Sequence, residues 1–141
     1  MVVPIPIIIT NPALGTTNRK KGDQNTQMEN TKLIAASLSI FDNNNQVNDS
    51  EMLNLWNKLV EEGADGIFIG GSVGECFLLK NSERIHMFEE ASRFAASTNQ
   101  PLDIYAHVGA LSTDEAIEMA RAAKSAGIKH IASTPPFYFS L

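Results

Sequence analysis

One unit recurs along most of this chain: a short apolar run rich in β-branched residues, then a polar loop, then a helix. The apolar runs fall at residues 33–41, 66–69, 102–106 and 130–132, and one unit is about thirty residues long, as in a strand–helix–strand motif. The runs are mostly continuous rather than alternating, which is typical of strands buried on both faces of a parallel sheet. Strands joined through helices run parallel, so the sequence predicts an α/β fold.

Start and stop signals separate the predicted helices from the apolar runs. Short polar side chains favour the first position of a helix, and a glycine in the left-handed conformation favours its end. These signals are caps at Asp49 or Ser50, at Asn81 or Ser82 and at Ser112 (which with Glu115 forms a capping box), and terminal glycines at Gly63 and Gly127.

The first 31 residues lack this pattern. From Thr10 to Thr31 the chain is rich in Asn, Thr, Gln, Gly and Lys and has no apolar period, a composition that cannot bury enough apolar surface to fold. We therefore predict a disordered leader over residues 1–31 and one folded domain over residues 32–141.

Composition excludes several functional classes. Of the 141 residues 43% are hydrophobic and 19% charged, as in a globular protein. The net charge of −5 does not favour binding to nucleic acid or anionic lipid. No apolar run approaches the roughly 20 residues of a membrane helix, and the opening segment lacks the basic region of a signal peptide. With a single cysteine, Cys76, we expect a cytoplasmic protein.

Two architectures fit the order of elements: an open doubly wound sheet, or part of a (β/α)₈ barrel. In both, function resides where strands end and helices begin. The second run ends in Gly-Gly-Ser-Val-Gly-Glu at residues 70–75. Its glycines allow successive amide N–H groups to point outward as an anion site, although the same glycines also suit a simple tight connector.

Two further residues follow apolar runs. His107 follows the third run, where a hydrogen-bonded structural role is commoner than catalysis. No second histidine or carboxylate stands at ligand spacing from it, so no metal site is predicted. Tyr138 follows the fourth run behind Pro135 and Pro136, on a segment that the prolines stiffen. Its phenol either relays protons or fills space as an aromatic plug.

Several of these motifs occur together in one known family. Residues 63–75, Ser82-Glu83-Arg84, residues 106–109 and Pro135-Pro136-Phe137-Tyr138 stand in the same order in the dihydrodipicolinate synthase and N-acetylneuraminate lyase superfamily of class I pyruvate-dependent aldolases. The chain resembles that family from about residue 32 to its end. The sequences at 106–109 and 136–138 favour the sialic acid lyase branch.

The resemblance implies a (β/α)₈ TIM barrel, of which this chain would be the N-terminal half with about four βα units. It implies an aldolase whose late lysine forms a Schiff base with pyruvate. The residues 70–75 loop would bind the pyruvate carboxylate through Gly71, Ser72 and Val73, and Tyr138 would match the proton-relaying tyrosine. The implied partners are a keto-acid or sugar-acid substrate and further copies of the chain in a homo-oligomer, with no cofactor and no metal.

Departures from the family pattern leave three functions open. Val73 replaces a second hydroxyl residue in the carboxylate loop, and Ser39-Ile40-Phe41 replaces a threonine-proline-phenylalanine. The Schiff-base lysine would lie beyond Leu141, and Lys80, Lys124 and Lys129 are poorly placed substitutes. The alternatives are an N-acetylneuraminate lyase-like chain, dihydrodipicolinate synthesis or another pyruvate-dependent aldolase reaction, and a catalytically inactive fragment that only self-associates.

Overall fold

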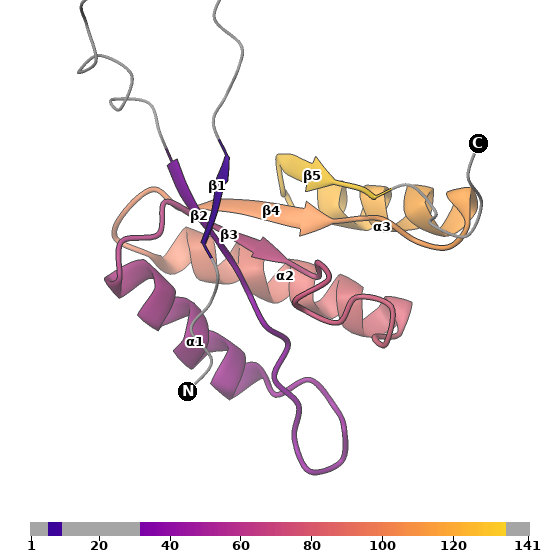
Figure 1. Cartoon of the computed structure of the whole chain (residues 1–141), viewed down its shortest axis with the longest axis horizontal. Helices are drawn as coiled ribbons and strands as arrows, with labels where there is room; N and C mark the ends of the chain where they lie inside the picture. Colours follow the sequence, from indigo (N-terminus) through magenta and orange to yellow (C-terminus); the bar gives the residue numbers. More distant parts are fainter. Residues whose placement is uncertain (1–5, 10–31, 135–141) are drawn as a thin grey trace, which may run out of the picture.

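A computed structural model describes residues 6–9 and 32–134 of the chain. These residues form one five-stranded sheet, in the order β1-β2-β3-β4-β5, and three helices (Figure 1). The elements in chain order are β1 Pro6–Ile9, β2 Lys32–Ala36, α1 Asp49–Glu61, β3 Gly66–Ile69, α2 Asn81–Ser97, β4 Asp103–His107, α3 Thr113–Ser125 and β5 His130–Ala132.

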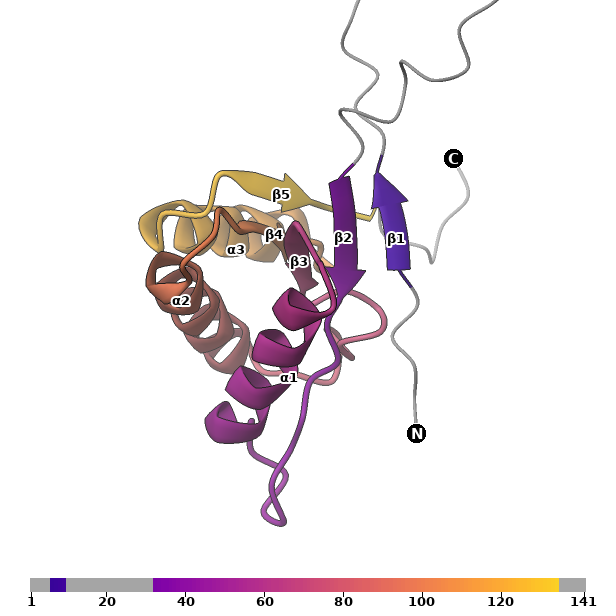
Figure 2. The same ribbon diagram turned by 90° about the vertical axis from the view of Figure 1, so that its left-hand side faces the viewer.

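Strands β2 to β5 are parallel and each neighbouring pair is joined through one helix. The prediction of alternating strands and helices in one parallel sheet is therefore confirmed. The three helices lie along the same face of the sheet (Figure 2). Within the described part of the chain, no helix has the length and apolar character that crossing a bilayer requires.

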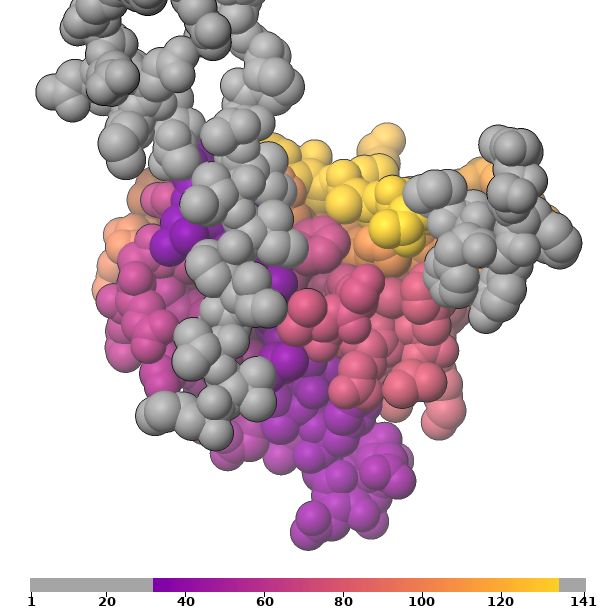
Figure 3. Space-filling model, viewed as in Figure 1, coloured from indigo at the N-terminus to yellow at the C-terminus, as the bar shows by residue number. Residues whose placement is uncertain are grey.

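Strand β2, predicted over residues 33–41, is shorter than predicted. It ends at Ala36 rather than at Phe41, because the chain leaves the sheet after Ser37 and Phe41 pairs with Val47 instead. Between these two residues lies a tight turn, in which the Asp42 carboxylate accepts the N–H groups of Asn44 and Gln46 at 2.8 and 2.9 Å. Asn45 has the left-handed backbone that such a turn needs, with φ 58°. The turn projects from the lower edge of the molecule (Figure 3).

The hydrophobic core lies between the sheet and the helices. Alternate residues of each strand point to the helices, and the buried set includes Ile67 and Ile69 of β3 and Ile104 and Ala106 of β4. Facing them are the fully buried Trp56, Phe88 and Met119, one from each helix. Trp56 also donates its indole N–H to the Ser37 hydroxyl at 2.9 Å, which satisfies the one polar atom of a buried tryptophan.

The predicted helix ends are confirmed with small differences. Ser112 caps α3, accepting the Glu115 N–H at 3.2 Å, and Gly63 and Gly127 follow α1 and α3 at φ 95° and 86°. The cap of α1 is Asn48, one residue earlier than predicted, whose side-chain oxygen accepts the Glu51 N–H. The cap position of α2 is Lys80, whose N–H donates to the Glu83 carboxylate at 2.8 Å.

The opposite face of the sheet carries ring-bearing side chains. Register pairs Phe68 with Tyr105 and Tyr105 with His130, which places all three on this face. The rings of Tyr105 and His130 stack at 4.6 Å. Gly66 lies among them, and a Cβ there would stand 2.8 Å from the Ile34 Cδ1 and from the Asp103 carbonyl oxygen. Glycine is therefore required for the close approach of these strands.

The leader differs from its prediction at one place. Residues Pro6–Ile9 form β1, which pairs antiparallel with β2, Ile7 opposite Ile34. No strand is predicted there from the sequence. The prediction of a disordered leader rests on the polar composition of residues 10–31. Strand β1 was missed because a four-residue apolar run ahead of that segment carries little periodic signal. Residues 10–31 lie outside the described residues, so the domain boundary at residue 31 stays a prediction.

Backbone direction shows which groups of β2 pair with β1. The Leu33 N–H bonds to the Asp65 carboxylate and the Leu33 carbonyl accepts the Asp65 N–H, so Leu33 faces β3. The Ser37 N–H likewise bonds to the Phe68 carbonyl. Because successive residues of a strand turn their peptide groups to opposite sides, Ile34 faces β1 and Ala35 faces β3.

Deletion of residues 1–10 is therefore expected to expose the Ile34 amide while leaving the Ala35 amide protected. Hydrogen exchange followed by NMR measures both amides in one sample, and Ala35 serves as the internal control. Equal protection of Ile34 with and without residues 1–10 would contradict the pairing of β1 with β2.

Candidate active site

The loops at the carboxyl ends of the parallel strands lie together, as the α/β architecture requires. They comprise residues 70–80 after β3 and residues 108–112 after β4. The β4 and β5 ends stay joined beyond the strands, since the Val108 N–H donates to the Ala132 carbonyl at 2.8 Å. Apolar side chains at this end remain exposed in spite of the burial elsewhere: Val73, Phe77, Leu78 and Leu111.

The glycine-rich segment after β3 folds into a tight turn. Gly70 has φ 63°, and the turn is closed by the Glu75 N–H donating to the Ser72 carbonyl at 3.1 Å and the Cys76 N–H donating to the Gly71 carbonyl at 3.3 Å. Among the described residues, the N–H groups of Ser72, Val73 and Gly74 donate no hydrogen bond. Successive free N–H groups in such a turn form a concave site for an anion.

The turn is held from below by the segment after β2. The Ser39 hydroxyl donates to the Gly74 carbonyl at 2.7 Å. A Cβ at Gly74 would stand 3.1 Å from the Ser37 carbonyl oxygen, and one at Gly71 would stand 2.4 Å from the Phe68 ring. Both glycines are therefore needed for close packing, while the Ser72 hydroxyl remains exposed and makes no hydrogen bond to any described residue.

A buried guanidinium supports this end of the sheet. Arg84 of α2 is 3% exposed and donates from one Nη atom to the carbonyls of His107 and Gly109, at 2.8 and 3.0 Å. Within the described part of the chain no carboxylate forms an ion pair with it. Burial lowers the pKa of Arg84. The Glu115 charge raises this pKa without forming an ion pair. A positive charge without a directly paired carboxylate makes the surrounding loops favourable to an anion.

Cys76 lies at the end of the turn, close to this charge. Burial raises the pKa of its thiol, and the Arg84 charge acts in the opposite direction. A buried thiol with a raised pKa is a weak nucleophile at neutral pH. We therefore assign Cys76 a packing role.

His107 connects the three strand ends. Its ring lies edge-on to the Phe68 and Phe77 rings at 6.2 and 6.4 Å, and its Nε2 is 3.3 Å from the Thr134 hydroxyl. Burial lowers the pKa of His107, the Arg84 charge lowers it further, and the Gly70 backbone opposes both. The ring is consequently neutral at pH 7, in keeping with the structural role expected from the sequence.

The structure brings three of the predicted site residues together. Gly71, Ser72 and Val73 form the turn, with Ser72 and Val73 exposed. Tyr138, the predicted proton relay, lies outside the described residues, and its role stays a prediction. The supporting role of Arg84 was missed, although Ser82-Glu83-Arg84 was noted as a motif, because sequence gives no sign that an arginine on a helix is fully buried.

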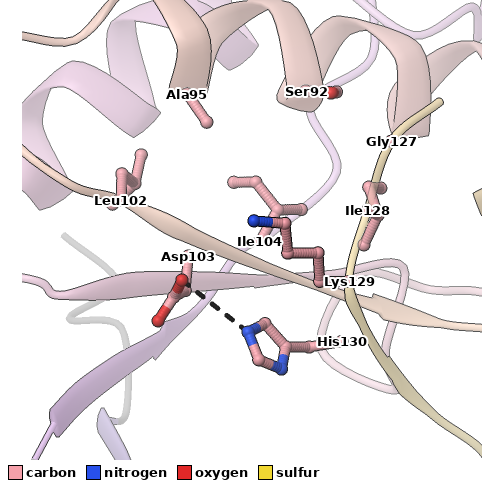
Figure 4. Close-up of a pocket in the computed structure, with 9 residues that line it drawn as sticks. All are labelled: Ser92, Ala95, Leu102, Asp103, Ile104, Gly127, Ile128, Lys129 and His130. Atoms are coloured by element: carbon pink, nitrogen blue, oxygen red, sulfur yellow. Dashed lines mark ion pairs between the residues drawn. The ribbon is translucent and has the colours of Figure 1, made fainter.

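A hollow of about 130 Å³ also lies at the other end of the sheet. Figure 4 shows its lining by Asp103 and His130, which form an ion pair at 3.7 Å, and by the apolar Leu102, Ile104 and Ile128. It sits at the amino ends of β4 and β5, where the loops that bind ligands in this architecture are absent. We assign it no ligand.

Comparison with known proteins identifies the family of the chain. The Dihydrodipicolinate synthetase family matches residues 29–141. The chain belongs to this family. Similar to it are the N-acetylneuraminate lyase of Shigella boydii serotype 4 (strain Sb227), 33% identical over 107 residues, and that of Salmonella newport (strain SL254), 33% identical over the same length; each match covers 76% of this chain. The chain spans about 35% of the length of these relatives.

Solved structures of the dihydrodipicolinate synthetase family share the fold. The prophage protein YagE from E. coli K12, solved with pyruvate, is 26% identical with a TM-score of 0.71, over 77% of this chain and 35% of that one. N-acetylneuraminate lyase from Mycoplasma synoviae is 26% identical with a TM-score of 0.68, over 75% and 36%. The predicted fold class, the N-terminal half of a (β/α)₈ barrel, is confirmed.

The lowered pKa of His107 predicts that stability falls in acid. Above its ordinary pKa of about 6.5 the ring is neutral in both the folded and unfolded chain. Below that value the unfolded chain binds a proton that the folded chain resists, so the free energy of unfolding decreases by up to about 1.4 kcal/mol per pH unit until the folded pKa is reached. Urea unfolding between pH 5 and 8 measures this loss.

The variant His107→Gln is expected to show a shallower pH dependence over the same window, whatever its stability at pH 8. Ser97→Ala, which removes no titratable group, is the control and should keep the wild-type slope. An unchanged slope in His107→Gln would contradict this assignment.

Proposed function

We propose that this chain supplies the carboxylate-binding part of a pyruvate-dependent aldolase of the N-acetylneuraminate lyase type, which cleaves N-acetylneuraminate to N-acetylmannosamine and pyruvate. The observation that carries the proposal is the turn after β3, which presents three N–H groups without partners among the described residues and the exposed Ser72 hydroxyl. A small carboxylate is the ligand that such a turn accommodates.

Three features favour a keto-acid carboxylate at this turn. The buried Arg84 adds positive charge beneath it without a carboxylate partner among the described residues. Exposed Val73 and Phe77 offer apolar contacts beside the N–H groups. The relatives with 33% identity are N-acetylneuraminate lyases, and YagE was solved in complex with pyruvate.

Among the residues that the structure describes, the proposed contribution is binding rather than bond cleavage. Cleavage through an imine needs an amine nucleophile beside the bound keto acid. Lys32 and Lys129 lie at the amino ends of β2 and β5, away from the turn, and Lys58 and Lys124 lie in the last turns of α1 and α3. Lys80 precedes α2 and lines an open cleft with Gln46 and Asp49.

Pyruvate is therefore expected to bind this chain reversibly, without forming a covalent adduct. Ser72→Ala should weaken binding roughly tenfold or more, because a hydrogen bond to a charged group contributes about 1.5–3 kcal/mol. Val73→Ser, which restores a second hydroxyl, should strengthen it. Isothermal titration measures the affinities, and borohydride treatment followed by mass spectrometry tests for an adduct.

Ser97→Ala, at the far end of α2, is the matched control and should bind as the wild type does. Equal affinity of the Ser72→Ala and wild-type chains for pyruvate would show that the turn is not the binding site. A stoichiometric, saturable borohydride adduct on one lysine would overturn the assignment of binding alone.

A second candidate function is self-association without catalysis, and the β5 edge favours it. Beyond β5 no further strand pairs within the described residues, so its outer backbone groups lack strand partners. Ile131 of this strand is 55% exposed. An unpaired edge with an exposed apolar side chain is a template for pairing with another chain.

The chain is therefore expected to be larger than a monomer at high concentration, as the predicted homo-oligomer also requires. Ile131→Lys places a charge on the edge strand and should shift the equilibrium toward the monomer. Light scattering at several concentrations measures the mass, and Ile117→Lys, on an exposed position of α3, controls for the added charge. A concentration-independent wild-type monomer would contradict this second function.

A further inference from the structure

Three potential metal ligands converge on the outer side of the helices, away from the turn after β3. Asp49 is the first residue of α1, and His86 and Glu90 lie one turn apart on α2. The His86 Nε2 is 2.9 and 3.0 Å from the two Asp49 carboxylate oxygens and 3.8 Å from the Glu90 Oε1. One ligand atom from each residue lies within 4.8 Å of the others.

These separations are close to those of ligands around one small ion. Zinc binds imidazole nitrogen and carboxylate oxygen at about 2.0–2.2 Å, so two ligands of a tetrahedral site stand about 3.4 Å apart. The His86–Asp49 separation would have to lengthen and the His86–Glu90 separation to shorten, each by about half an ångström or less. His86 and Glu90 stand four residues apart, the spacing that places two ligands on one face of a helix.

Hydrogen bonds alone cannot pair every carboxylate oxygen of this cluster. The Nε2 of a histidine carries at most one hydrogen, yet three carboxylate oxygens from two residues face it. Two carboxylates on one nitrogen also repel each other. Glu90 has a second partner in Arg93, which neutralises it in part. Asp49 has no cationic partner other than His86 among the described residues.

The cluster is open to solvent on one side. Asp49 and His86 line a cleft of about 390 Å³ together with Gln46, Lys80 and Glu83. Gln46 and Glu83 carry further side-chain oxygen atoms, and the Glu83 carboxylate also accepts the Lys80 N–H. The Asp49 and His86 side chains are 48% and 42% exposed. An ion could therefore enter without any rearrangement of the core and complete its coordination with water.

We propose that Asp49, His86 and Glu90 bind one divalent transition-metal ion, of the zinc and cobalt class, which ties the start of α1 to α2. A mixed nitrogen and oxygen ligand set selects such ions over magnesium and calcium, which prefer oxygen alone. The ion would add a link near the start of α1, whereas Trp56 and Phe94, with rings 5.7 Å apart, join the same two helices within the core. The site is separate from the turn that carries the proposed function.

Titration of the metal-free chain with Co²⁺ tests the proposal, because cobalt bound to nitrogen and oxygen ligands absorbs visible light. One equivalent is expected to bind, and Zn²⁺ should displace it. His86→Ala should abolish the visible band, and Asp49→Asn and Glu90→Gln should each weaken the affinity roughly tenfold or more. Because all three positions are on the surface, circular dichroism should show that the variants remain folded.

His130→Ala is the matched control, since His130 and Asp103 form a second histidine–carboxylate pair that lacks a third ligand in the described residues. This variant should bind Co²⁺ as the wild type does. Absence of stoichiometric binding, or binding that survives His86→Ala, would overturn the proposal. Equal affinity for Mg²⁺ and Co²⁺ would also overturn it, because binding would then come from the two carboxylates without the His86 nitrogen.

Discussion

The arrangement of the carboxyl-end loops depends on the buried Arg84. Its guanidinium bonds to the carbonyls of His107 and Gly109, the two residues between which β4 gives way to its loop. Unpaired buried carbonyls are costly, so the same contact satisfies the backbone and fixes where the strand ends. It also sets the position of the His107 ring against Phe68 and Phe77. Helix α2, the end of β4 and the segment leading out of the turn after β3 are thereby held as one unit.

Much of the fold could be predicted from the sequence because the local signals agree with the tertiary structure. The apolar runs predicted at 66–69 and 130–132 are β3 and β5 with the same bounds. Ser112 begins a helix, and Gly63 and Gly127 each follow the end of one, as predicted. Strand β2 was predicted too long because residues 38–41 are as apolar as the strand itself. Only the turn built on Asp42 shows that they leave the sheet.

The candidate site was predictable in part. Glycine spacing in residues 70–75 located the turn, because glycine is the residue that permits a φ of 63° at Gly70 and the contact of Gly71 with Phe68. The cluster of Asp49 with His86 was not predictable, since those residues stand 37 positions apart and meet only through the packing of two helices. The pairing of β1 with β2 was missed for the same reason: a strand partner across more than twenty residues leaves no local signal.

That pairing limits how the sheet can grow. The peptide groups of Ile34 on the outer side of β2 are occupied by β1, and a backbone N–H or carbonyl engaged in one ladder is not available to another. Within the described residues the sheet therefore ends at β1 on one side and at β5 on the other. Two copies that join through β5 by a two-fold axis would pair like edges and form a closed dimer. Pairing of β5 with the β1 edge of another copy would instead be head to tail and would leave an edge free for a further copy.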